Sequence, residues 1–240
     1  MREKKTIFSQ EDVMKLLDSL YEKALDGIPY VSKPISELAG EYLSKHENAE
    51  KAAKAMVRNQ VVKCTASGVI TGFGGFITLP VTVPANVSSV LYVQMRMVAC
   101  AAYMGGYEVD SDQVQTLVYA CLAGVAVGAV LKKVGLTFGN KVFVNLVKKI
   151  PGSVITKINQ KIGMRFITKF GQKGIINLGK LTPGVGAIIS GGFDYAETKV
   201  IAARAVKWFI HGDFTLDNDP ETDDFVIDVD DTKKDEENND

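Results

Sequence analysis

Apolar side chains recur along much of the chain at the spacing of a helix that buries one face. In residues 11–26 they fall three or four positions apart, so they share one side of a helix. Ser9 precedes this segment and Asp12 stands three positions later, a pairing typical of a capped helix N-terminus. Gly27 ends the pattern. The same reasoning predicts further helices over residues 35–46, 48–63, 84–104, 112–131, 151–170 and 183–210.

Glycine and proline separate these segments, and no stretch alternates apolar and polar residues as a half-buried strand does. The sequence therefore predicts an all-α fold, a single multi-helix bundle with Gly-rich apolar helices at its centre, over residues 1–212. Residues 213–240, called the acidic tail below, are dense in Asp and Glu and poor in large apolar side chains. We expect this tail to be disordered.

Two long uncharged stretches stand out, and the first lies between Lys63 and Arg96. Pro80 and Pro84 interrupt it, which favours two apolar arms joined by a turn. Such a helical hairpin could lie inside the protein or dip into a bilayer, because the same small residues serve both arrangements.

The second uncharged stretch, residues 113–131, is close to the ~20 residues that a membrane-spanning helix needs. Aspartates precede it and lysines follow it, which would place its C-terminal end in the cytoplasm. Gly124 and Gly128 form a GxxxG pattern, which lets two helices approach closely. A buried core helix has the same small residues and the same lack of charge, and the polar residues at the start of the stretch favour that alternative.

Arg96 is the only charged residue from Cys64 to Tyr107, so it needs a partner if its helix is buried. Asp194 is the candidate, because it is the first acid after Asp112 and also has apolar neighbours. We expect a structural ion pair between Arg96 and Asp194, and the alternative is a functional site built around the pair.

The charges are strongly segregated, although 28 basic and 28 acidic side chains give a formal net charge of zero. Residues 113–193 hold eleven Lys and Arg and no acid, whereas residues 213–240 hold thirteen acids and two lysines. The middle of the chain is therefore +11 and the acidic tail is −11. This segregation raises the possibility that the tail covers a basic face of its own chain.

A basic stripe lies within the predicted helix over residues 151–170 and just beyond it. Its members recur every four residues: Lys157, Lys161, Arg165, Lys169 and Lys173. An apolar stripe follows one position later: Ile158, Ile162, Phe166 and Phe170. Like charges one turn apart repel, and no acid nearby in sequence relieves them, so an anionic partner is expected. A membrane surface suits a basic amphipathic helix, whereas no nucleic-acid motif is present; the remaining alternative is a solvated face that happens to be basic.

Catalytic and metal-binding patterns are largely absent. Residues 174–180 match the start of a P-loop, but Leu181 follows where Ser or Thr is needed and no strand precedes. Only His46 and His211 could contribute imidazoles, so we predict no metal and no cofactor. Three cysteines without a CxxC pattern, and an N-terminus without an apolar signal segment, favour a cytoplasmic protein.

Three segments between about Lys51 and Phe209 carry a family resemblance. They read GFGGFITLPVTVP, QMRMVACAAYMGGYEVDSDQV and INQKIGMRFITKFGQKGIINLGKLTPGVGAIISGGFDYAETKVIAARAVKWF, and together they resemble the EcsC protein family. The resemblance implies a bacterial, helical protein associated with membranes, and hydrolase activity has been suggested for the family. Thr82 stands where members often have Asp, and Arg96 and Asp194 match charged positions of the family pattern.

These features lead to one leading function and two alternatives. We expect a non-enzymatic protein that lies peripherally on an anionic membrane through the basic stripe and is modulated by its acidic tail. The first alternative is a hydrolase, acting on lipid, with a site near Arg96 and Asp194 and a nucleophile among the nearby serines Ser67, Ser88 and Ser190. The second is an adaptor whose tail segment DDFVIDVDD docks a protein partner. The sequence leaves open whether the protein is an enzyme.

Overall fold

The computed structural model describes residues 9–65, 85–135, 142–170 and 196–216, and these residues form helices and connecting turns without a β-strand. The all-α prediction is confirmed. The helices are α1 (Gln10–Asp26), α2 (Ile35–Leu43), α3 (Ala49–Thr65), α5 (Ala85–Met104), α6 (Asp112–Ala123), α7 (Gly128–Lys133), α8 (Val142–Val147), α9 (Gly152–Phe170), a helical stretch over 196–205, and the π-helix η1 (Val206–Ile210) that continues it.

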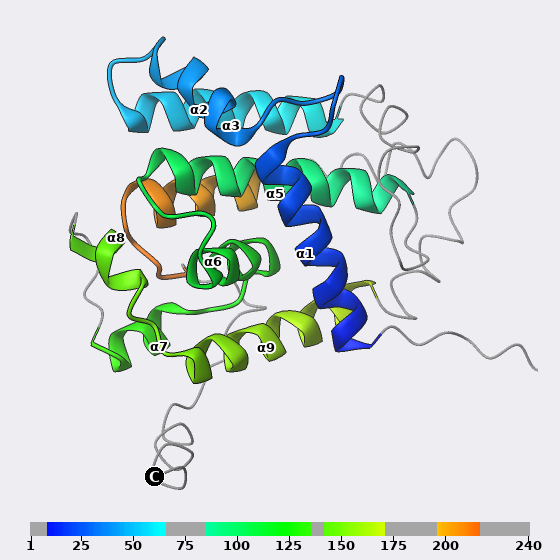
Figure 1. The fold of residues 1–240 in the computed structure, drawn as a ribbon, viewed down its shortest axis with the longest axis vertical. Helices are drawn as coiled ribbons and strands as arrows, with labels where there is room; N and C mark the ends of the chain where they lie inside the picture. The colour runs from blue at the N-terminus through cyan, green and yellow to red at the C-terminus, as the bar shows by residue number, and fades with distance from the viewer. Residues whose placement is uncertain (1–8, 66–84, 136–141, 171–195, 217–240) are drawn as a thin grey trace, which may run out of the picture.

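Helix α5 forms the centre of the fold. It packs against α1, α2, α3, α6 and η1, and every residue from Leu91 to Ala102 is buried. Figure 1 shows α2 and α3 above α5, with α6 and α9 below it and α1 running from the level of α5 to α9. Burial on all sides over residues 91–102 explains why this part of α5 carries a single charge, Arg96.

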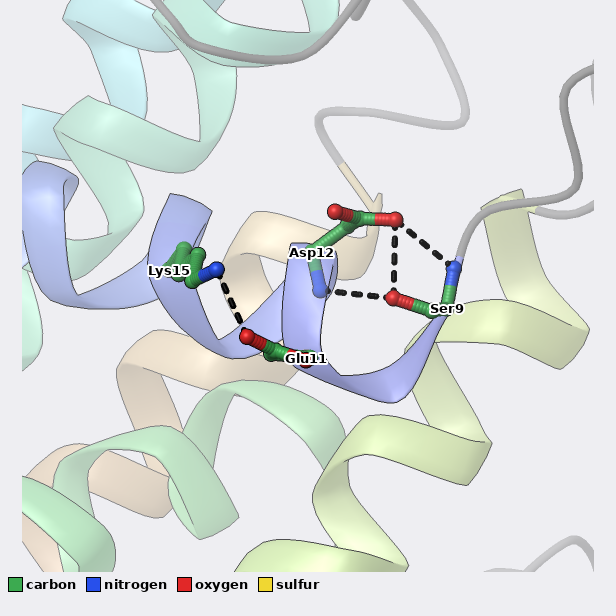
Figure 2. Close-up of polar contacts among 4 residues, drawn as sticks. All are labelled: Ser9, Glu11, Asp12 and Lys15. Carbon is green, nitrogen blue, oxygen red and sulfur yellow. Dashed lines mark hydrogen bonds and ion pairs between the residues drawn. The ribbon is translucent and has the colours of Figure 1, made fainter.

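Helix α1 begins with the predicted capping arrangement (Figure 2). The Asp12 backbone N–H donates to Ser9 Oγ at 3.0 Å, and the Ser9 backbone N–H donates to Asp12 Oδ2 at 3.0 Å. The hydrogen bonds from Ser9 also lower the pKa of the Asp12 carboxyl. Two amides at the start of the helix therefore find acceptors, which directs the chain into α1.

Replacing Ser9 with alanine should lower the free energy of unfolding by ~1 kcal/mol, since the Asp12 amide would lose its acceptor. Urea unfolding followed by circular dichroism measures the change. The matched control is Ser9→Asn, which keeps a side-chain acceptor at the same position and should stay within a few tenths of a kcal/mol of the native protein. Equal stability of all three proteins would show that the cap contributes nothing.

The single helix predicted over residues 112–131 is wrong, because the structure divides it in two. Helix α6 ends at Ala123, and Gly124 adopts a left-handed conformation with φ 69°. Helix α7 begins only at Gly128, and α6 alone is ~18 Å long against a hydrocarbon core of ~30 Å. Among the described residues, no helix has the length and apolar character that crossing a membrane requires.

The two glycines of the GxxxG pattern have other roles than helix–helix packing. Gly124 supplies the left-handed turn that ends α6, a conformation that side chains with a Cβ disfavour. Gly128 lies against the backbone of Phe214, whose carbonyl oxygen would be 2.9 Å from a Cβ at this position. The stretch is thus part of the core, as its alternative interpretation predicted, with Leu117, Val118 and Val125 among its fully buried residues.

Residues 206–216, called the C-terminal strap, close the described part of the chain. The side chain of Phe214 is fully buried among the rings of Tyr107, Trp208 and Phe209. The Trp208 indole N–H donates to the Thr215 carbonyl at 3.4 Å, and Asp213 Oδ1 accepts from the Thr215 backbone at 3.0 Å. The packed chain therefore continues beyond Gly212, where the sequence places the start of the acidic tail.

Candidate functional site

Helix α9 carries the predicted basic stripe, and its apolar stripe faces inward as expected. Ile158 and Ile162 are fully buried and Phe166 is 4% exposed, where α9 packs against α1 and α6. The side chain of Phe170 lies outside the described residues. The apolar edge of α9 is therefore part of the protein core, and its contacts are with other helices.

Among the side chains that the structure describes, the solvent-facing side of α9 carries no charge. Four residues spaced one turn apart form this side: Thr156, Gln160, Met164 and Thr168. The hydroxyls of Thr156 and Thr168 each donate to the carbonyl four residues earlier, both at 3.0 Å. Met164 is 48% exposed, so a thioether lies at the middle of this outer side.

The basic residues lie between the buried and the exposed sides of α9. Lys157 and Lys161 are half-buried, and we call these two residues the lysine edge. Burial lowers the pKa of the Lys161 ammonium, because partial loss of water disfavours its charge. The side chain of Lys169 and the whole of Lys173 lie outside the described residues, so the structure places three of the five predicted residues.

Arg165 belongs to the stripe in sequence but is engaged with another helix. Its Nε donates to the Ala123 carbonyl at 2.8 Å, at the carboxyl end of α6. Arg204 reaches the same helix end, where its Nη1 donates to the Cys121 carbonyl at 2.6 Å. Cationic side chains are stabilised at a helix C-terminus, because the last carbonyls carry partial negative charge. The contact of Arg165 accounts for part of the positive charge in residues 113–193, the segment without acids.

Sequence reasoning missed Arg204 as a partner of α6. The sequence does contain an indication of this contact. Gly124 is a residue type that often ends a helix, and the last carbonyls of a helix attract arginine. That signal was hidden by the uncharged run, which favoured one continuous helix through Gly124.

Arg96 is buried, at 5% exposure, as the sequence predicted. Its Nη1 donates to the Ala24 carbonyl in the last turn of α1, at 3.2 Å. The proposed partner Asp194 lies outside the described residues, and so the ion pair stays a prediction. The candidate nucleophiles Ser67 and Ser190 also lie outside them, as does the side chain of Ser88.

The two described cysteines are unfavourably placed for nucleophilic chemistry. Cys100 and Cys121 are buried, and burial raises the pKa of each thiol to about 12, which disfavours the reactive thiolate. The described residues contain no cluster of His, Cys, Asp and Glu that could hold a metal ion.

Comparisons with protein families, with curated proteins and with solved structures find no match to this chain. The EcsC resemblance therefore stays a prediction based on the three sequence segments.

Proposed function

We propose that the protein associates peripherally with an anionic membrane surface through the lysine edge of α9. The observation that carries the proposal is the division of α9 into three sides. Its apolar side is occupied by the core, the described residues of its outer side are uncharged, and the lysine edge lies between them on a helix without any acid. A negatively charged surface facing α9 would meet lysines and polar groups without like-charge repulsion.

The burial of the apolar stripe determines the kind of association. Ile158, Ile162 and Phe166 fill the interior, so they contribute nothing to lipid contact. Binding then depends on charge, with each lysine near an anionic leaflet contributing ~1 kcal/mol. Such binding weakens as salt shortens the range of the interaction. An anionic surface also favours the charged form of Lys161, offsetting the effect of its partial burial.

The test is co-sedimentation with phosphatidylserine-containing vesicles and with neutral phosphatidylcholine vesicles, at low and at high salt. The double variant Lys157→Gln/Lys161→Gln should bind the anionic vesicles ~30-fold more weakly, because two contributions of ~1 kcal/mol are lost. The matched control is Lys45→Gln/Arg58→Gln, which removes two exposed charges from the region of α2 and α3. Figure 1 shows that region on the other side of α5 from α9.

Three results would contradict the proposal. Equal binding to neutral vesicles would remove the electrostatic basis, and equal loss in the two double variants would remove the role of α9. Binding that survives a carbonate wash would show that other segments insert into the bilayer. A fourth measurement uses duplex DNA as the competing polyanion: tighter binding to DNA than to vesicles, lost in the α9 variant, would reassign the lysine edge to nucleic acid.

A further inference from the structure

The C-terminal strap places the start of the acidic tail at a defined point on the fold. Phe214 is buried, and its carbonyl oxygen lies against Gly128 at the junction between α6 and α7. The Thr215 Cα also approaches Gly128, at 3.5 Å from where a Cβ would lie. Figure 1 shows the strap, in orange, descending from the level of α5 toward α6. Residues 217–240 therefore begin at this junction.

The same junction contacts α9. Arg165 of α9 donates to the Ala123 carbonyl, and Ala123 precedes Gly128 by five residues, or at most ~17 Å of chain. Helix α7 follows directly and ends in two exposed lysines, Lys132 and Lys133. The tail thus starts beside the part of the molecule that carries the basic residues of α7 and α9.

Length and charge make the tail a suitable occupant of this surface. Residues 217–240 carry twelve acids and two lysines, so their net charge is −10. Their 24 residues can extend over as much as ~80 Å, whereas α9 is ~28 Å long, so its whole length is within reach. Because tail and helix belong to one chain, docking is intramolecular, with an effective concentration on the order of millimolar.

We propose that residues 217–240 dock on the lysine edge of α9 and on the lysines of α7, and that they compete there with an anionic membrane. The docking contact is inferred only from the position of the C-terminal strap and from the opposite charges of the tail and the lysines of α7 and α9. Its consequence for membrane binding rests on the function proposed above. A membrane with enough negative charge displaces the tail. The amount of protein bound should therefore rise more steeply with the anionic lipid content of the membrane than it would without the tail.

The contact is tested without lipid, on the full chain, by zero-length carbodiimide cross-linking of carboxylates to lysines followed by mass spectrometry. We expect cross-links within one molecule from residues 217–240 to Lys157 or Lys161 at low salt, and their loss at high salt. Lys45 serves as the internal control, because it is exposed and follows α2 on the other side of α5. Equal cross-linking of Lys45, or cross-links only between molecules, would overturn the proposal.

The consequence is tested by vesicle binding of two further variants. One ends at Leu216, and the other keeps the tail but replaces its twelve acids with Asn and Gln. If the tail covers the lysine edge in ~90% of the molecules, both variants should bind anionic vesicles ~10-fold more tightly. Cross-links without vesicle binding by any variant would refute the proposed function but would still support docking of the tail on α9. Unchanged vesicle affinity in both variants would refute the competition between tail and membrane. If the tail segment DDFVIDVDD captured a protein and no cross-links formed, the docking proposal would be overturned in favour of the adaptor alternative.

Discussion

Gly105→Ala is expected to destabilise the protein by ~3 kcal/mol, the upper end of the usual cost of overpacking. An added Cβ would lie 2.0 Å from the Phe209 carbonyl oxygen and 3.1 Å from Tyr107 Cε2. The oxygen belongs to the backbone of η1, so it cannot rotate aside as a side chain would. The end of α5 and η1 would have to move apart, which would loosen the aromatic cluster between them.

The matched control for this prediction is Gly40→Ala in α2. No atom lies within 4 Å of a Cβ at Gly40, and α2 continues on both sides of it. Alanine should therefore stabilise the protein there by ~0.5–1 kcal/mol, because it loses less backbone entropy than glycine on folding. Urea unfolding of both variants gives opposite signs if the close approach at Gly105 is correct. A Gly105→Ala protein that unfolds like the native one would contradict it.

Phe214→Ala should cost ~3–5 kcal/mol, the range for removing a large aromatic ring from a packed interior. The Phe214 ring is fully buried, with its centroid 5.2 Å from that of Trp208 and 5.7 Å from that of Phe209. Thermal unfolding measured by calorimetry, together with the near-ultraviolet signal of Trp208, follows the loss. The result is informative because the substitution lies within the segment that the sequence assigned to a disordered tail.

Leu216→Ala is the control for Phe214→Ala. Leu216 is only partly buried against the same core, so its truncation should cost ~1 kcal/mol or less. If the two variants had equal and small effects, the C-terminal strap would lie outside the cooperative fold. The tail would then lack the fixed starting point from which its docking is inferred.

The elements predicted best from the sequence are those whose pattern depends on neighbouring residues. The Ser9 and Asp12 cap of α1 and the buried stripe of α9 follow from helical spacing, and the structure reproduces both. Local spacing sufficed there because the partners are one turn away, or because one face of a helix must pack somewhere.

The features that the sequence missed depend on partners far along the chain. The end of α6 at Gly124 is stabilised by Arg165 and Arg204, which lie about 40 and 80 residues further on. Phe214 stands among acids, so composition predicts exposure, yet it packs against the ring of Tyr107, which follows α5, and against Trp208 and Phe209 of η1. A glycine in an apolar run and an aromatic in an acidic run are ambiguous until those partners are known.

A buried arginine in an apolar sequence predicts a carboxylate partner, which for Arg96 is Asp194. A terminal carbonyl of a helix also attracts a guanidinium group, and the Ala24 carbonyl accepts one here. The four-residue spacing places Arg165 in the lipid-binding stripe, although its Nε donates to a carbonyl of α6. Lys157 and Lys161 stay as the described residues of that stripe on which the membrane proposal depends.

Arg96, Arg165 and Arg204 share one kind of acceptor, the main-chain oxygen in the last turn of a helix. An amide oxygen gains no proton across the range in which carboxylates are neutralised. Hydrogen bonds of this kind therefore persist as the medium becomes acidic, whereas a surface ion pair such as that of Lys54 with Glu50 is lost once the carboxylate is protonated. We therefore expect the contact of α1 with α5 to keep its geometry as the medium becomes acidic. The same holds for the contacts that Arg165 and Arg204 make with the end of α6.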